Sequence, residues 1–249
     1  MNASSNMSGR FRKVGALAAG ILCAGMVLWA ADPGCFFSHG PKDKNEIVLT
    51  FDDGPGPSTE KILDILKRYQ VKATFFMEGS QVAARPQIAR KVAEAGHEIG
   101  GHSYSHVNFY QSVNGDKEAL LTKEIEKTAH LISNITGTPQ HLMRMPHGYV
   151  RSWVKDVAKK ENLVLVNWTF GCDWKKYAPD ELARVYIENI KPGAVFLMHD
   201  GGGNRKSTVE ALPAIIEEIQ KRGYKLVTAG EMFGVPRQPA SPMKMISDK

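Results

Sequence analysis

The sequence predicts an α/β protein, built as a closed or nearly closed (β/α) barrel of about seven parallel strands. Strand-like and helix-like segments alternate from about residue 46 to residue 234, which predicts parallel βαβ units. About seven strands over this length fit a barrel better than an open sheet, although the alternation is compatible with both. In addition, polar residues suited to chemistry follow the predicted strands, where a barrel collects its functional side chains.

Short apolar, β-branched or aromatic runs mark the strands, and apolar residues three and four apart mark the helices. The predicted strands are residues 47–51, 73–77, 97–100, 142–145, 163–168, 194–198 and 225–228. The predicted helices are residues 59–69, 86–95, 116–135, 153–161, 179–190 and 208–222. Gly96 and Gly137 follow two of these helices as C-terminal stops, and Pro179 begins a third.

The periodic segments indicate one domain. A chain of 249 residues with 43% hydrophobic content can bury one large core or two smaller ones. Residues 46–234 show no long polar break, so we expect a single core there. Residues 32–45 are rich in Pro, Gly and Lys and are predicted to be a tether, whereas residues 235–249 lack apolar periodicity and are predicted to be a loose tail.

The N-terminus has the arrangement of an export signal. Residues 1–13 are polar and basic, and residues 14–31 form an uncharged, mostly apolar run that ends in the small residues Ala30 and Ala31. This pattern predicts a secreted, periplasmic or envelope-associated protein. The same run is long enough for an uncleaved membrane anchor, so residues 1–31 are either a signal peptide or an anchor. Outside the cytoplasm, Cys35 and Cys172 form either one disulfide or two unpaired thiols.

The charge balance excludes one class of partner. The formal net charge is +6, but Arg10, Arg12 and Lys13 lie in the signal-like segment. Without them, 29 basic residues face 26 acidic ones, a net charge of +3 that suits an acidic surface or polymer. No arginine-rich run or aromatic-basic interleaving is present, so we do not expect a nucleic acid partner. We expect a monomer.

Polar and charged side chains follow five of the predicted strands, which places them at one end of a barrel. In chain order they are Asp52 and Asp53, His102 and His106, Arg144, Asp173 and Trp174, and His199 and Asp200. Two adjacent carboxylates at the edge of a core repel each other and lose hydration, so a bound cation is expected beside them. An ordinary solvated Asp-Gly-Pro turn is the alternative.

The histidines provide a metal-ligating pattern. His102 and His106, at i and i+4, would lie on one face of a helical turn and could chelate one ion. Asp53 as a third ligand would complete a two-histidine, one-carboxylate set with open positions, which is typical of catalytic zinc. The histidine pair alone is weak evidence, because surface histidines often have this spacing; the acid pair upstream strengthens it.

Five motifs together resemble those of one family. They are TFDDGP at residues 50–55, HSYSH at 102–106, RMPHG at 144–148, CDW at 172–174 and LMHD at 197–200. Their order and approximate spacing resemble the polysaccharide deacetylase family, the NodB-homology group that forms carbohydrate esterase family four. The resemblance covers roughly residues 46–234, which would be the catalytic domain with the irregular (β/α) barrel of the NodB-homology fold.

The resemblance implies a role for each motif residue. One divalent ion, usually zinc with cobalt, nickel or manganese as alternatives, would be bound by Asp53, His102 and His106. Asp52 would be the general base, held in place by Arg144. His199 would be the general acid, with its ring oriented by Asp173. The substrate-binding residues would be Pro146, His147, Gly148, Trp174 and Leu197, although this family usually has an aromatic residue at the position of His147.

The expected activity is therefore removal of N-acetyl groups from an amino-sugar polysaccharide by a metal-dependent hydrolase. Export and mild basicity favour peptidoglycan, at either N-acetylglucosamine or N-acetylmuramic acid. Chitin-type oligosaccharides or another poly-N-acetylglucosamine are alternatives within the same class. From a different class, a catalytically silent wall-binding module is the alternative, although silent relatives typically lack a ligand, the base or the acid.

Overall fold

The computed structural model describes residue 1, residues 31–111 and residues 115–235. The predicted signal or anchor lies outside this part of the chain except for Met1 and Ala31, and so does the predicted tail after Val235. Among the described residues, no helix is both long enough and apolar enough to cross a membrane.

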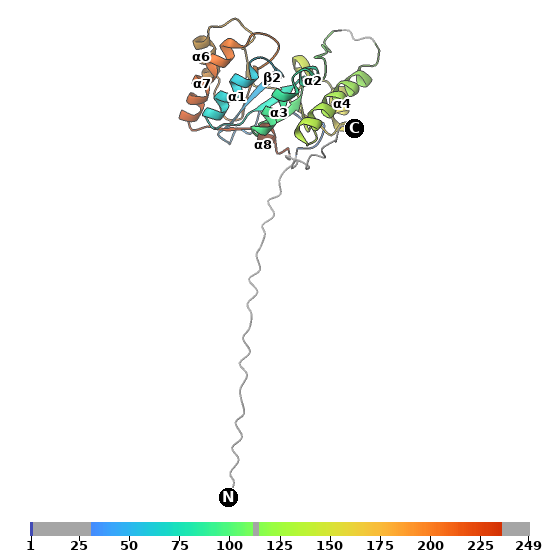
Figure 1. Cartoon of the computed structure of the whole chain (residues 1–249), viewed down its shortest axis with the longest axis horizontal. Helices are drawn as coiled ribbons and strands as arrows, with labels where there is room; N and C mark the ends of the chain where they lie inside the picture. Colours follow the sequence, from blue (N-terminus) through green and yellow to red (C-terminus); the bar gives the residue numbers. More distant parts are fainter. Residues whose placement is uncertain (2–30, 112–114, 236–249) are drawn as a thin grey trace.

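A parallel sheet of nine strands forms the centre of the described domain and curls into an incomplete barrel, which confirms the predicted fold class (Figure 1). The strands run in the order β1-β6-β5-β4-β3-β2-β8-β7, and β9 pairs with β2 outside this path. The bounds are β1 Phe36–Phe37, β2 Glu46–Gly54, β3 Thr74–Met77, β4 Glu98–Gly101, β5 Leu142–Met143, β6 Val164–Val166, β7 Phe170–Gly171, β8 Ala194–His199 and β9 Lys225–Val227.

Helices cover the sheet from outside. Figure 1 shows α1, α6 and α7 together on one side of the domain and α2, α3 and α4 on the other, and the contacts between these helices agree. Their bounds, with a short 3-10 turn at Pro146–Gly148, are α1 Thr59–Arg68, α2 Gly79–Ala84, α3 Pro86–Glu94, α4 Lys117–Thr136, α5 Ser152–Lys160, α6 Pro179–Glu188, α7 Lys206–Lys221 and α8 Ala229–Phe233. The longest helix, α4, begins where the Asp116 carboxylate accepts two backbone N–H groups and ends at left-handed Gly137.

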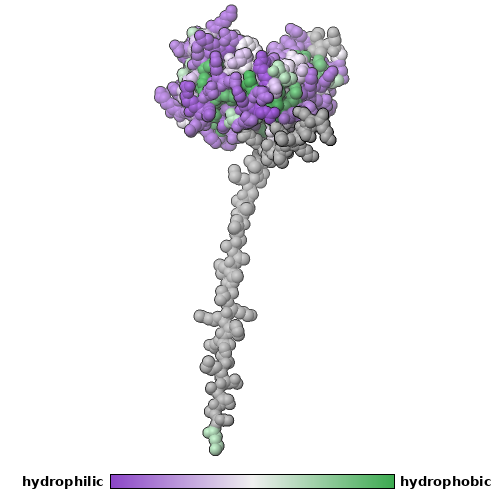
Figure 2. All heavy atoms as spheres, in the orientation of Figure 1, coloured by the Kyte–Doolittle hydropathy of each residue, from purple (hydrophilic) through white to green (hydrophobic). Residues whose placement is uncertain are grey.

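Strand β2 organises the core because it is buried on both faces. Leu49 and Phe51 pack in one apolar cluster beneath α1, α6 and α7, whereas Val48 packs in a second cluster with β6 and α8. This explains why the strand is a continuous apolar run instead of an alternating one. The outer surface is mostly hydrophilic on the face shown in Figure 2, which agrees with the burial of apolar residues around this strand.

The segment predicted as a tether is part of the sheet. Phe36 and Phe37 form β1, which pairs in parallel with β6, and the Gly40 N–H donates to the Gly193 carbonyl at 2.8 Å. The prediction was wrong because a strand of two residues has no period to detect. Cys35 in this segment and Cys172 are free thiols, so the unpaired alternative is the one observed.

Candidate active site

The paired carboxylates lie inside β2, where a backbone irregularity turns both toward one place. Successive side chains of a regular strand point to opposite faces. Here the pairing with β3 shifts register between Asp52 and Gly54, and Asp53 has a left-handed φ of 66°. The extra residue re-aims the second carboxylate, as bulges near active sites do. The neighbouring strand β8 places His199 beside Asp52 in register.

Asp53, His102 and His106 converge as predicted. The Asp53 Oδ1 atom lies 3.5 Å from Nε2 of His102 and 3.5 Å from Nε2 of His106, and the three ligand atoms lie within 4.8 Å of one another. Tetrahedral zinc with ligands at about 2.0–2.1 Å places its ligand atoms about 3.3–3.4 Å apart. The two Asp53–histidine distances are therefore close to the spacing that such a metal requires.

The Oδ1 atom of Asp53 is buried and has no hydrogen bond from the described part of the chain to satisfy it. Burial alone would raise the pKa of Asp53, but the facing imidazoles, His102 first, bring that pKa below its ordinary value. Burial and the neighbouring His102 ring lower the pKa of His106 to about 4, so this imidazole is neutral at pH 7. An ionised carboxylate and a neutral imidazole are the forms that bind divalent metals, so Asp53 and His106 fit a cation.

The route by which the two histidines converge differs from the prediction. His102 follows β4 directly, and residues 102–106 form no helical turn. Instead, Ser103 and His106 have left-handed φ angles of 59° and 54°. These two reversals, which are uncommon outside glycine, bring the rings to 5.0 Å between centroids. The i, i+4 spacing was correct, but the helical explanation for it was wrong.

Glu124 on α4 holds this loop, and the sequence analysis did not identify it. Its Oε2 atom accepts the backbone N–H groups of Tyr104 at 2.9 Å and Ser105 at 2.7 Å, and its Oε1 atom accepts the Ser105 hydroxyl at 3.0 Å. A buried carboxylate that accepts loop N–H groups fixes a conformation that the loop would not otherwise keep. In sequence, Glu124 resembles any helical acid, so only the structure reveals it.

Arg144 follows β5 and is completely buried against Asp52. Its Nη1 atom donates to the Asp52 Oδ1 atom at 2.7 Å and to the Thr50 hydroxyl at 2.7 Å. The other guanidinium nitrogens donate to the carbonyl groups of Val166 and Asn167, each at 2.9 Å. A guanidinium held at every edge leaves its carboxylate partner little freedom.

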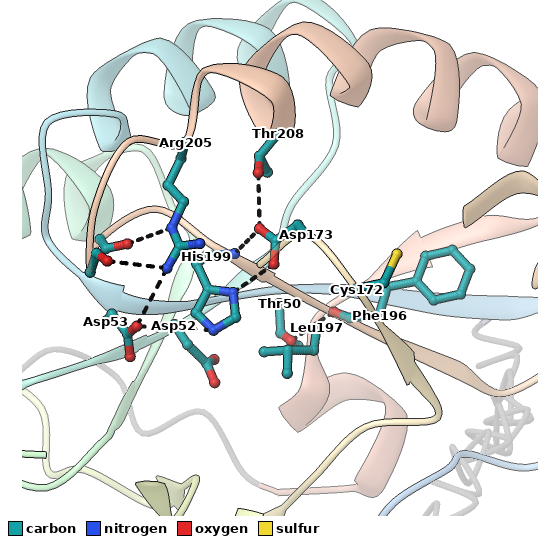
Figure 3. Close-up of polar contacts among 12 residues, drawn as sticks. Thr50, Asp52, Asp53, Cys172, Asp173, Phe196, Leu197, His199, Arg205 and Thr208 are labelled. Carbon is teal, nitrogen blue, oxygen red and sulfur yellow. Dashed lines mark hydrogen bonds and ion pairs between the residues drawn. The ribbon is translucent and has the colours of Figure 1, made fainter. Parts of the chain in front are cut away.

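His199 and Asp173 form the second pair. The Nδ1 atom of His199 lies 2.7 Å from Asp173 Oδ1, and Asp173 Oδ2 accepts the His199 backbone N–H at 2.8 Å and the Thr208 hydroxyl at 2.9 Å (Figure 3). Burial opposes protonation of the ring, but the hydrogen bond and charge of Asp173 raise the pKa of His199 above its ordinary value. Asp173 follows β7, a strand that was not predicted from the sequence; Asp173 was expected after the strand at residues 163–168.

These groups surround one cavity of about 380 Å³. Its lining residues are Asp52, Asp53, His102, His106, Met145, His147, Trp168, Trp174, Leu197 and His199. Of the predicted substrate-binding residues, Trp174, Leu197 and His147 line the cavity; Pro146 and Gly148 belong to the adjacent 3-10 turn. A Cβ atom at Gly148 would lie 2.6 Å from the Trp168 ring, so glycine is required there. Trp168 lies in the cavity wall and also packs against the apolar cluster around β6.

His147 and Asp200 depart from the pattern of the other motif residues. The exposed His147 ring lies edge-on to that of His106, with 4.7 Å between centroids. Asp200 points away from the cavity, and its Oδ2 atom accepts the Thr59 hydroxyl at 2.5 Å. Burial raises the pKa of Asp200 to about 7. Asp200 therefore supports the turn after β2 and does not face the cavity.

The contents of the cavity indicate a class of enzyme. The cavity combines a three-ligand cation site, a carboxylate fixed by arginine and an imidazole whose protonated form is favoured. Hydrolases that cleave amides or esters typically place a proton acceptor and a proton donor on either side of the carbonyl group that is attacked.

Known proteins share this fold and sequence. The family model for polysaccharide deacetylase matches residues 39–166. A peptidoglycan-N-acetylglucosamine deacetylase of Bacillus cereus is 36% identical over 202 residues, which cover 80% of this chain and 72% of that protein. A crystal structure of a peptidoglycan N-acetylglucosamine deacetylase in complex with 4-naphthalen-1-yl-N-oxidanyl-benzamide superposes with a TM-score of 0.77 at 35% identity, covering 82% of this chain and 95% of that one.

A second solved structure shows that the fold also exists without activity. A CE4 family pseudoenzyme from Bacillus anthracis superposes with a TM-score of 0.73 at 31% identity, covering 80% of this chain and 69% of that one. The matched family model and the similarity over 80% of the chain show that the chain belongs to the polysaccharide deacetylase family. Its class of activity is the deacetylation of polysaccharides.

Proposed function

We propose that the protein is a divalent-metal-dependent N-deacetylase of peptidoglycan that acts on N-acetylglucosamine, with zinc as the metal. The proposed metal site is supported mainly by the buried Asp53 Oδ1 atom. This atom has no hydrogen-bond partner in the described chain and lies 3.5 Å from Nε2 of both histidines. The substrate is supported by the relative named a peptidoglycan-N-acetylglucosamine deacetylase and by the mild positive charge of the chain after the signal-like segment.

Each protein group has a defined task in this reaction. The ion, held by Asp53, His102 and His106, would polarise the acetamide carbonyl and acidify water. Asp52 is fixed at Oδ1 by Arg144, so its other oxygen is the one available to take a proton from attacking water.

His199 completes the reaction on the leaving-group side. Its Nδ1 atom is hydrogen-bonded to Asp173, so Nε2 is the atom that would donate a proton to the departing sugar amine. Cleavage then yields acetate and a free amine on the polymer. The acetyl methyl group would lie against Trp174 and Leu197 in the cavity wall.

The alternative of a silent wall-binding module is less well supported. A CE4 pseudoenzyme demonstrates that the fold persists without catalysis. In this chain, however, the cation site, the Asp52–Arg144 pair and the Asp173–His199 pair all have hydrogen-bonding or ligand-compatible distances. A scaffold kept for binding alone would have no need of all three.

The proposed substrate lies outside the cytoplasm, so the proposal includes export directed by residues 1–31, with anchoring by residues 14–31 as one form of it. A reporter that is active only after export, fused after Lys44, tests this directly. Activity in the culture medium or envelope fraction is expected. A reporter that remains in the cytoplasm would contradict export and remove one reason for choosing a wall polymer.

The test of the function is acetate release by the purified protein from peptidoglycan, chitin oligosaccharides and acetylxylan, each with and without a chelator. We expect the fastest release from peptidoglycan, and we expect the chelator to abolish it. Preference for chitin oligosaccharides would replace the substrate but keep the chemistry. No acetate from any substrate, with metal bound, would support the silent module.

A further inference from the structure

Arg205 reaches into the site from the end of the loop after β8, and the proposed mechanism does not use it. Its side chain is only 11% exposed, and its Nε atom donates to the Gly201 carbonyl at 2.7 Å. The Nη2 atom donates weakly to the Gly202 carbonyl at 3.4 Å and lies 3.8 Å from Asp53 Oδ2 (Figure 3). The guanidinium is therefore anchored by its own loop and aimed at a carboxylate of the cation site.

The two oxygens of Asp53 face different neighbours. Oδ1 faces His102 and His106, whereas Oδ2 faces Arg205 at 3.8 Å and the Nε2 atom of His199 at 4.0 Å. Rotation about the terminal carboxylate bond is soft, because it joins sp³ and sp² carbons. Without another partner for Oδ2, this carboxylate could turn to accept the same His199 proton that the reaction needs.

The loop is shaped for this contact. Gly202 has a left-handed φ of 64°, and a Cβ atom there would lie 2.4 Å from Asp53 Oδ2 and 3.2 Å from the Arg205 Nη2 atom. A Cβ atom at Gly201 would lie 1.8 Å from the Asp53 carbonyl oxygen. Glycines at these two positions let the loop backbone touch Asp53 and bring the guanidinium beside it.

We propose that Arg205 is a positioning residue that holds Asp53 with Oδ1 toward the histidines and Oδ2 away from His199. The guanidinium is always charged and presents a planar set of donors, so it can hold a carboxylate from a fixed anchor. The inference rests on the proposed metal-dependent function and adds a residue to it. It also gives a role to the glycine-rich loop that follows the LMHD motif.

Charge repulsion and a positioning role predict opposite changes in zinc affinity when Arg205 is replaced, so the two can be distinguished. A cation near a metal ligand repels a dication, so removing its charge should tighten metal binding if charge alone mattered. Removing a group that orients a metal ligand typically weakens binding by about 10- to 100-fold. For Arg205→Met we therefore expect weaker zinc binding in that range, and a fall in kcat larger than the change in KM.

The experiment is a calorimetric titration of zinc into chelator-stripped protein. Arg184→Met is the matched control, because Arg184 forms an exposed pair with Glu188 on α6. Arg205→Lys, which keeps the charge without the planar fork, is the second variant and should also weaken binding. Millimolar guanidinium should partly restore Arg205→Met. Thermal melting shows whether each variant is folded.

The outcomes separate this inference from the proposed function. Zinc affinity that is unchanged or increased in folded Arg205→Met would overturn the positioning role. If Arg205→Met does not fold, the Arg205→Lys titration decides in the same way. A wild-type protein that binds no zinc would instead refute the proposed metal-dependent function.

Discussion

Replacing Asp173 with Asn should lower the pKa of His199 and move the upper pH limit of activity. Asp173 uses both oxygens, one for the His199 ring and the other for the His199 backbone N–H and Thr208. Asn offers only one carbonyl oxygen. The backbone N–H must still be accepted, so the Asn NH2 group would face the ring, where it cannot stabilise an imidazolium.

The size of the effect follows from the lost contact. A hydrogen bond to a charged group contributes about 1.5–3 kcal/mol. At about 1.36 kcal/mol per pKa unit, the pKa of His199 should fall by about 1–2 units. A general acid must be protonated to act, so a lower pKa means that activity is lost at a lower pH on the basic side. Loss of a positioned proton donor should also reduce the maximal rate by about 10²-fold or more.

The assay is the pH profile of kcat/KM for acetate release, with zinc content measured in parallel. Asp180→Asn is the matched control, because it removes an exposed acid at the start of α6 and should leave the profile unchanged. Zinc content should stay the same in Asp173→Asn. A basic limb that does not move, or a variant that loses its metal, would refute the assignment of Asp173 and His199 as the acid pair.

Four further substitutions test other parts of the site. Asp52→Asn should abolish turnover while zinc remains bound, whereas Asp53→Asn should weaken both turnover and zinc binding. Equal loss of zinc from the two variants, measured by metal analysis, would show that the roles of base and metal ligand are not divided between these residues. Arg144→Met leaves a buried carboxylate unpaired and should destabilise the fold by about 3–5 kcal/mol in denaturant unfolding; an unchanged midpoint would contradict this. Glu124→Ala removes the carboxylate that accepts the N–H groups of the histidine loop, so it should weaken zinc binding. Unchanged zinc affinity in calorimetry would count against this role.

The sequence predicted the fold where patterns extend over several residues. The buried run of β2, the helix after it and the polar residues at the strand ends follow from hydrophobic periodicity and the geometry of parallel sheets. Strands β1 and β7, which have two residues each, were not predicted as separate strands. They exist because of pairing with β6 and β8, which local sequence does not encode.

The features of the site were likewise predicted only where they depend on residue types and spacings. The types and spacings of Asp53, His102 and His106 indicated a cation site, and the structure brings the three together. The conformation of the 102–106 loop was not predictable, because it depends on left-handed residues held by Glu124 from a distant helix. Arg205 was missed for the same reason: its contact with Asp53 arises only when β2 and the loop after β8 meet.

The dependence of turnover on zinc stoichiometry shows whether one metal ion at Asp53, His102 and His106 drives the reaction. Chelator-stripped protein would receive zinc in small steps while acetate release from peptidoglycan is measured at each step. We expect no release without zinc, a linear rise, and a plateau at about one ion per chain, because three ligands converge at one site. Full activity of the stripped protein, or a plateau reached only at two or more ions per chain, would contradict this expectation.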